Sequence, residues 1–227
     1  MFWLVPPRGL HQADGSERYY LDFTRPACKA AASRGVRVVG VSTLGRGYQG
    51  RAGVLSAALA MDMLIEGTGT AYRALALPFF MENLLRQAQA IKDQGTFSMA
   101  NAAGWPLPTI ATRDIAAVAA ALLLDASWSG QASVPVAGPD NLTPDDMAEV
   151  ISDTLGRTVR YRQVPVADYQ AMMLRRGASQ AIAQDIADMT EAQNNGICDA
   201  EPRDPNSATP TSFRQWCQDT LKSALQA

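Results

Sequence analysis

Histidine and cysteine are scarce in this chain of 227 residues, which contains one histidine, His11, and three cysteines. A zinc site built on two or three histidines is therefore excluded. A Ser–His–Asp triad would have to use His11, which lies in a polar stretch of sequence. The cysteines, Cys28, Cys198 and Cys217, form no CxxC pair, and their odd number does not indicate a disulfide framework. This usage favours a reducing compartment, so we expect a cytoplasmic protein without a metal site.

Concentrated positive charge is also missing, because 20 Lys and Arg residues oppose 22 Asp and Glu residues and no basic run occurs. Nucleic-acid grooves need clustered positive charge, so no direct nucleic-acid partner is expected. The longest apolar run, residues 115–124, is far shorter than the roughly 18 residues that a membrane span needs. The opening MFWLVPP has no basic region of the kind that starts a signal peptide. The remaining composition, 47% apolar and 19% charged, is that of a globular protein with a sizeable core.

Short β-branched runs alternate with helical segments in the first half of the chain. Strands are predicted at residues 36–42 and 70–77, following a short apolar run at residues 2–5. Helices are predicted at residues 24–34, with Thr24 as N-cap and proline in the first turn, and at residues 54–65. The order strand, helix, strand, helix, strand is typical of a parallel sheet, and we predict an α/β fold.

The second half is predicted to contain more helix. The expected helices and strands are residues 80–93 (helix), 113–125 (helix), 133–137 (strand), 143–156 (helix) and 158–164 (strand). Residues 97–99 are too few to assign on their own. From residue 167 onward the pattern is helical, with a break at residues 199–211 and a last helix at residues 212–225. We therefore expect two domains: residues 1–137 around the parallel sheet, and a small, mainly helical C-terminal subdomain at residues 138–227.

Gly45, Gly47 and Gly50 match the GxGxxG spacing of dinucleotide-binding loops and follow a predicted strand. Two features contradict that function. The next helix starts after three further residues instead of at the third glycine, and no acid stands at the end of the following strand. Asp62 and Glu66 lie on the helix instead. We interpret the segment as a loop that is not the main phosphate site.

Four segments in order resemble the NmrA-like family of atypical short-chain dehydrogenase/reductases. They are FWLVPP (2–7), PFFMENLLRQ (78–87), TRDIAAVAAALLLD (112–125) and GPDNLTPDDMAEVISDTLGR (138–157). The resemblance implies an NAD(P)-binding Rossmann-like parallel sheet, with residues 2–7 as the family's fourth strand. The family's first three strands, which carry its glycine-rich loop, would then be missing before Met1. At 20 to 25 residues for each strand and helix, that part is about 65 residues long.

The resemblance also implies where a cofactor would bind, at the carboxyl ends of the strands. The expected cofactor-binding residues are Pro6, Pro7, Ser42, Thr43, Pro78 and Phe79, and the expected substrate cleft contains Phe80 and Asn83. A hydroxyl at Ser42 or Thr43 could polarise a carbonyl or simply cap the strand end. The two phenylalanines could stack near a nicotinamide or belong to the core, and Asn83 could face the cleft or bond a neighbouring loop.

No catalytic residue is assigned, because the Tyr-x-x-x-Lys pair of the wider superfamily is absent from the sequence. Ala76 and Leu77 also stand where the family has Arg-Pro. Three hypotheses follow. The absent pair favours a dinucleotide-binding redox sensor or regulator with weak or no turnover. The first alternative is an NAD(P)H-dependent oxidoreductase acting on quinone-like or other small carbonyl compounds. Alternatively, it could be a scaffold that forms a homodimer through an exposed sheet edge at Phe2, Trp3 and Leu4.

Overall fold

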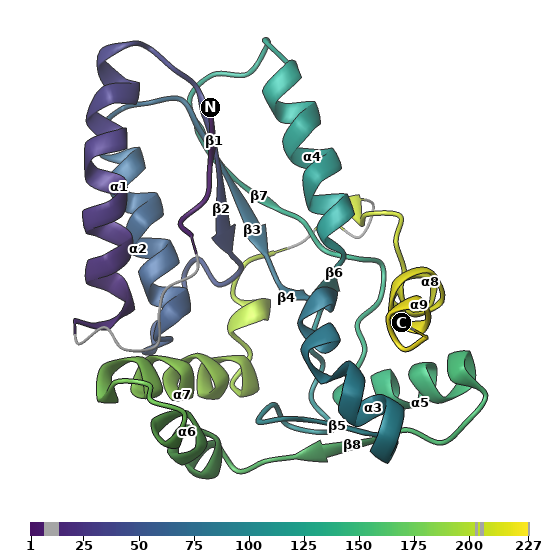
Figure 1. Cartoon of the computed structure of the whole chain (residues 1–227). Coiled ribbons are helices and arrows are strands. Elements are labelled where there is room, and N and C mark those ends of the chain that lie inside the picture. Colours follow the sequence, from purple (N-terminus) through teal and green to yellow (C-terminus); the bar gives the residue numbers. More distant parts are fainter. Residues whose placement is uncertain (7–13, 203, 205–206, 227) are drawn as a thin grey trace. The chain divides into compact units, whose positions relative to one another are not determined.

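The computed structural model describes residues 1–6, 14–202, 204 and 207–226, which form two compact units (Figure 1). Unit 1 contains Met1–Leu77, Ala117–Pro135 and Val166–Pro202, and unit 2 contains Pro78–Ala116, Val136–Pro165 and Arg203–Ala227. Each unit thus combines three separate segments, whereas the sequence suggested two continuous domains that meet at residues 137 and 138. That domain division stays a prediction.

Unit 1 is built on a four-stranded, fully parallel sheet in the order β1-β2-β3-β7. The strands are β1 (Phe2–Trp3), β2 (Val38–Thr43), β3 (Tyr72–Leu77) and β7 (Gln131–Pro135). Ser42 is paired with Ala76, and Thr43 is paired with Leu77, so β2 and β3 end side by side. The parallel α/β fold predicted from the sequence is confirmed.

Helices α1 (Gly15–Ser33) and α2 (Val54–Glu66) lie next to each other beside this sheet (Figure 1). The sequence prediction for α1 was wrong about its start, because the helix begins nine residues before Thr24 and encloses Pro26. Proline in a helix interior costs one backbone hydrogen bond, yet the helix continues here because Tyr19 and Tyr20 pack on the apolar cluster of unit 1. The Thr24 hydroxyl does not cap the helix; it accepts a hydrogen bond from Trp3 Nε1 at 3.2 Å.

The core between these helices and the sheet consists of buried apolar side chains. They are Val5, Cys28, Ala31, Val38, Met61, Ile65, Tyr72 and Ala74. Helices α6 (Val166–Arg175) and α7 (Gln180–Asn194) and the short 3₁₀ helix η2 (Ile197–Asp199) also belong to unit 1. Helix α4 (Thr112–Leu124) passes from unit 2 into unit 1.

Unit 2 contains two short parallel strand pairs. β4 (Phe79–Phe80) pairs with β6 (Thr109–Ile110), and β5 (Thr96–Met99) pairs with β8 (Arg160–Gln163). The predicted helix at residues 80–93 was only partly correct, because Phe80 is in a strand and the helix starts as the 3₁₀ segment η1 (Met81–Gln87) before α3 (Ala88–Gln94). Side chains three apart align in a 3₁₀ helix, which places Met81 and Leu84 together in the core.

The remaining helices of unit 2 are α5 (Pro144–Leu155), α8 (Phe213–Trp216), the π-helical segment η4 (Cys217–Leu221) and α9 (Lys222–Ala224). Helix α5 starts as the sequence predicted: Thr143 and Asp146 form a reciprocal capping box, with Pro144 next to the cap. The core is a contiguous apolar cluster in which Phe213 and Trp216 are stacked. Among the helices of the described chain, none is long and apolar enough to cross a membrane.

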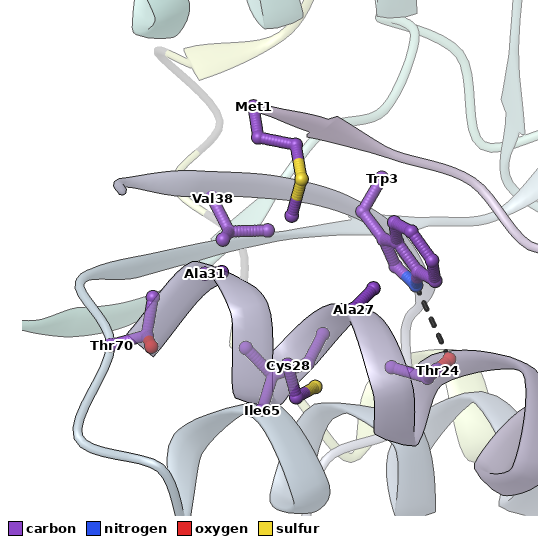
Figure 2. A pocket seen from close by; sticks show the side chains of 9 residues that line it. All are labelled: Met1, Trp3, Thr24, Ala27, Cys28, Ala31, Val38, Ile65 and Thr70. Atoms are coloured by element: carbon purple, nitrogen blue, oxygen red, sulfur yellow. Dashed lines mark hydrogen bonds between the residues drawn. The ribbon is translucent and has the colours of Figure 1, made fainter. Parts of the chain in front are cut away.

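A small apolar pocket lies between β1 and α1 (Figure 2). It is lined by Met1, Trp3, Thr24, Ala27, Cys28, Ala31, Val38, Ile65 and Thr70. Val38 is the first residue of β2 and Thr70 precedes β3, so the pocket lies at the amino ends of these strands. Dinucleotides bind parallel sheets at the opposite, carboxyl ends. Burial raises the pKa of the Cys28 thiol in this pocket, which keeps it protonated and favours a packing role.

Candidate functional site

The expected site residues are divided between the two units. Pro6, Ser42 and Thr43 belong to unit 1, and Pro78, Phe79, Phe80 and Asn83 belong to unit 2, while Pro7 lies outside the described residues. Within unit 1, Ser42, Thr43 and Leu77 meet at the carboxyl end of the sheet. Within unit 2, both phenylalanines are half-buried in β4. Each unit therefore contains part of the predicted set, and the shared cofactor site stays a prediction.

The Ser42 hydroxyl is not available to a ligand as a donor, because it donates a hydrogen bond of 2.5 Å to Asp62 Oδ2 on α2. A serine hydroxyl has one proton, and this one is used within the protein. Burial does not separate the two hydroxyl candidates, because Ser42 is 7% and Thr43 is 8% exposed. With Asp62 ionised, Ser42 cannot donate to a substrate carbonyl, so the structure favours the strand-end alternative for this residue.

Asp62 is the centre of a buried polar cluster. Its side chain is 2% exposed, and besides Ser42 it accepts a hydrogen bond of 2.6 Å from the Tyr72 hydroxyl and lies 3.5 Å from the guanidinium of Arg46. Burial raises the pKa of Asp62 to about 6, although the hydrogen bonds from Ser42 and Tyr72 and the charge of Arg46 act in the opposite direction. Burial and the neighbouring Asp62 charge raise the pKa of the Tyr72 hydroxyl, so it stays a proton donor.

Gly40 makes this contact between β3 and α2 possible. The Tyr72 side chain crosses β2 at Gly40, where a Cβ would clash with the tyrosine hydroxyl and ring. Only glycine at this position leaves room for the Tyr72 ring to pass over β2 and reach Asp62. A glycine in the middle of a buried strand is thus explained by the hydrogen bond that it allows.

The GxGxxG-like segment forms the loop between β2 and α2, as the sequence predicted, and α2 starts only at Val54. Arg46 is the cation within residues 45–50, and its guanidinium binds the Glu66 carboxylate at 2.9 and 3.3 Å. Because Glu66 and Asp62 neutralise Arg46, its charge is not available to a phosphate group. The paired Arg46 therefore agrees with the interpretation of this segment as a loop that is not the main phosphate site.

Thr43 is the site hydroxyl of unit 1 that is bound only to backbone. Its Oγ1 donates to the carbonyl of Leu44 at 3.1 Å and lies 3.5 Å from the carbonyl of Leu77. These bonds hold the hydroxyl at the sheet end and leave its lone pairs able to accept a hydrogen bond. Thr43 is therefore the stronger of the two hydroxyl candidates.

A second buried acid, Glu201, follows η2 in unit 1. It is 7% exposed and accepts a hydrogen bond from the Ser133 hydroxyl of β7. Within the described part of the chain, its other oxygen has no hydrogen-bond partner. No group of three or more His, Cys, Asp or Glu residues suited to a metal ion occurs in the same part.

The polar groups near the predicted cleft residues of unit 2 have structural partners. Glu82 accepts hydrogen bonds from the backbone of Thr112, at the start of α4, and from Trp216 Nε1. Asp114 accepts two hydrogen bonds from Thr211, and Arg113 pairs with Asp219 at 3.0 Å. Arg113 and Asp114 thus have structural partners in unit 2. Asn83 is half-buried in η1, and its place in a substrate cleft stays a prediction.

The sequence interpretation did not identify the Asp62 cluster as a unit. One signal was available, because Asp62 is the single charge within the apolar run VLSAALAMDMLI of α2. A lone carboxyl on a buried helix needs a hydrogen-bond partner. The identity of that partner depends on how Tyr72 crosses Gly40, which no local pattern shows.

Comparison with known proteins identifies one family model and several curated relatives that are similar to this chain. A model of the NmrA-like family matches residues 64–210. The NAD(P)H azoreductase of Xenophilus azovorans is 35% identical over 119 residues, which cover 52% of this chain and 41% of that protein. Prestalk A differentiation protein A of Dictyostelium discoideum is 24% identical over 170 residues, covering 72% and 55%. The chain therefore spans about half the length of these curated relatives.

The fold is shared with solved structures as well. The NADPH-dependent quinone oxidoreductase QOR2 of Escherichia coli, complexed with NADPH, superposes with a TM-score of 0.68 at 22% identity, covering 88% of this chain and 70% of that one. This likeness confirms the Rossmann-like α/β fold. Since the family match covers more than half of the sequence, the chain belongs to the NmrA-like family.

Proposed function

We propose that this protein binds NAD(P)(H) and reduces a small, flat, conjugated acceptor of the quinone or azo type. The observation that carries the proposal is the parallel sheet of unit 1, where β2 and β3 end together at Thr43 and Leu77. Such sheet ends are the usual place for a dinucleotide. Two of the similar proteins are named for NAD(P)H- or NADPH-dependent reduction of azo or quinone compounds.

A flat conjugated acceptor also agrees with the residues that are absent. When bound, the dinucleotide supplies the hydride, so the protein has mainly to place the nicotinamide against the acceptor. An extended π-system spreads the charge that it receives, and needs less help from a proton donor than an isolated carbonyl does. The missing Tyr-x-x-x-Lys pair and the inward-turned Ser42 hydroxyl are compatible with this class of substrate.

The test is a calorimetric titration with NADPH and NADH, followed by assays of NADPH oxidation with a quinone and azo panel. Micromolar binding and acceptor-dependent oxidation support the proposal. Thr43→Val should weaken NADPH binding several-fold, since it removes the hydroxyl at the sheet end. The matched control Thr70→Val changes a buried threonine before the start of β3 and should bind as the parent does. No binding at millimolar NADPH and NADH would refute the proposal.

A second candidate is a dinucleotide-binding redox sensor in the cytoplasm with weak or no turnover. It is favoured because the Ser42 proton is donated to Asp62 and the Thr43 proton to the Leu44 carbonyl, so both hydroxyl protons at this strand end are used within the protein. Binding of NAD(P)(H) without oxidation by any acceptor would support the sensor over the reductase. Nucleic acid and membrane are not expected as direct partners of either.

Self-association through β1 stays a further proposal. In the described structure β1 pairs with β2 alone, and Met1, Phe2 and Leu4 are 41%, 44% and 54% exposed. Exposed apolar edge strands favour pairing with another strand, here from a second copy. Multi-angle light scattering should show a dimer that Phe2→Lys and Leu4→Lys convert to monomer, and a parent chain that is monomeric at high concentration would disprove it.

A further inference from the structure

The Asp62 carboxyl connects three segments of unit 1 that are separate in sequence. It accepts hydrogen bonds from Ser42 at the carboxyl end of β2 and from Tyr72 at the start of β3, and it pairs with Arg46 in the loop between β2 and α2. We propose that Asp62 is a positioning residue, which fixes the end of β2 and the following loop so that a rigid sheet end meets the bound dinucleotide. That the ligand is a dinucleotide rests on the proposed function, whereas the positioning of the strand end and loop by Asp62 does not.

Stability alone gives little reason for this carboxyl. Burying a charge is costly, and replacing a buried ionic group by well-packed apolar residues is often neutral or stabilising. The side chain lies on an apolar helix, beside Met61 and Ile65 of the core. Where buried ionic groups have a demonstrated benefit, it is specification of one geometry. In this protein the geometry that Asp62 specifies is that of Ser42 and Arg46.

The loop at residues 44–53 is held at several points, and Asp62 acts on the part next to β2. Arg46 binds Glu66 as well as Asp62, and at the far end of the loop Arg51 pairs with Asp188 of α7 at 3.2 Å. Gly53 lies so close to the backbone of Asp185 that a Cβ would clash there. The far end therefore has its own anchors, and loss of the Asp62 carboxylate should loosen mainly residues 44–48.

The charged and titratable groups around Asp62 come from every element that packs on it. Arg46 comes from the loop, Glu66 from α2 and Tyr72 from β3, and Glu201 contributes its charge through Arg46. On the neighbouring helices, Tyr20 and Cys28 of α1 have pKa values raised by burial. Two acids of α7 have other partners: Asp185 accepts a hydrogen bond from the Ser16 backbone, and Asp188 accepts one from Gln184 and pairs with Arg51.

The first experiment measures hydrogen exchange of the loop without any ligand. The amides of Leu44 and Tyr48 are hydrogen-bonded to Leu77 O and Gly45 O, so both report on loop opening. Asp62→Asn should accelerate their exchange on the order of tenfold, as for a segment that gains access to local opening. Tyr72→Phe is the matched control, because it removes one bond to the same carboxyl but retains Ser42 and Arg46, and it should leave both amides unchanged.

A second variant, at a more exposed side chain, keeps the proposal testable if Asp62→Asn does not fold. The Arg46 side chain is 39% exposed, and Arg46→Gln removes the loop's contact with Asp62 and with Glu66 while the core stays intact. It should accelerate Tyr48 exchange more than Leu44 exchange, because Ser42 still holds the strand end. Unchanged exchange of both amides in Asp62→Asn and Arg46→Gln would overturn the proposal.

The second experiment measures NADPH affinity and turnover against pH. In the parent, affinity should decline on the order of tenfold as Asp62 is protonated below about pH 6, with KM rising more than kcat falls. Asp62→Asn should bind NADPH at every pH with the weak affinity that the parent shows in acid, and its affinity should not change around pH 6. If the parent binds no NADPH but loop exchange responds as expected, the proposed function fails and the positioning role stands. If the parent binds NADPH and Asp62→Asn binds equally well with the same pH profile, the positioning role fails.

Discussion

Replacing Asp62 with asparagine should change how the stability of unit 1 depends on pH. Burial raises the pKa of this carboxyl from 3.8 to about 6, so the folded protein holds the proton more tightly than the unfolded chain does. A raised pKa of an acid contributes stability at pH values below the unfolded pKa, and this contribution is lost as pH rises through the folded pKa. The parent should therefore lose stability between about pH 4 and pH 6 because of Asp62.

The magnitude follows from the difference between the two pKa values. At roughly 1.4 kcal/mol for each pH unit, the change from 3.8 to about 6 corresponds to ~3 kcal/mol. The side chain is only 2% exposed, so solvent screening reduces this figure little. Asparagine keeps the shape without the charge and should not show this loss. Since the unfolded carboxyl is already partly ionised at pH 4, the free energy of unfolding of Asp62→Asn, relative to the parent, should rise by ~2 kcal/mol from pH 4 to pH 7.

The assay is denaturant unfolding at several pH values from 4 to 8, followed by circular dichroism and tryptophan fluorescence. Asp219→Asn is the control, since hydrogen bonds from Gln215 and Arg113 lower the pKa of this exposed acid and place its effect at lower pH, with the opposite sign. Its difference from the parent should stay constant between pH 5 and 8. If Asp62→Asn instead became less stable than the parent as pH rises, the hydrogen bonds would outweigh burial and the reasoning would be refuted.

Three further substitutions test local features of the fold. Pro26→Ala should stabilise unit 1 by about 1–3 kcal/mol in denaturant melts, because it restores a hydrogen bond inside α1, and a loss of stability would contradict this. Gly53→Ala should strongly destabilise unit 1 or loosen the loop, since Gly53 has φ +48° and a Cβ would clash with the Asp185 backbone; unchanged melting and loop exchange would exclude that contact. Thr143→Ala should cost about 1 kcal/mol through the lost cap of α5, whereas Thr143→Ser should be close to neutral in the same melts.

Periodic and capped segments could be predicted from the sequence because their signals are local. The β-branched run that forms β2 and the apolar run that forms α2 are within two residues of their predicted bounds. Thr143 with Pro144 marked the start of α5 because capping involves neighbours in sequence. The start of α1 could not be predicted in this way. Pro26 is normally a sign of a helix start, and the tertiary packing of Tyr19 and Tyr20 overrides it.

The candidate site was less predictable, because its chemistry depends on which group accepts the hydrogen bond of each hydroxyl. The sequence places Ser42 and Thr43 at a strand end as equivalent hydroxyls, and strand alternation turns them to opposite faces of the sheet. One of these faces carries Asp62, which accepts the Ser42 proton, while Thr43 binds only backbone. Similarly, Arg46 in a GxGxxG-like loop looks available to a phosphate until the structure shows Glu66 beside it.

These contacts also separate two substrate classes of a reductase, isolated carbonyls and flat conjugated acceptors. A reductase of isolated carbonyls needs a proton donor at the acceptor, and the Ser42 proton can serve only if Asp62 is itself protonated and can return one. With the pKa of Asp62 at about 6, this condition is met only in acid. Carbonyl reduction that depends on Ser42 would thus be an acid-side activity, whereas reduction of a flat conjugated acceptor would not need this proton. A neutral-pH activity that survives Ser42→Ala but not Thr43→Val would therefore identify the conjugated acceptor as the substrate class.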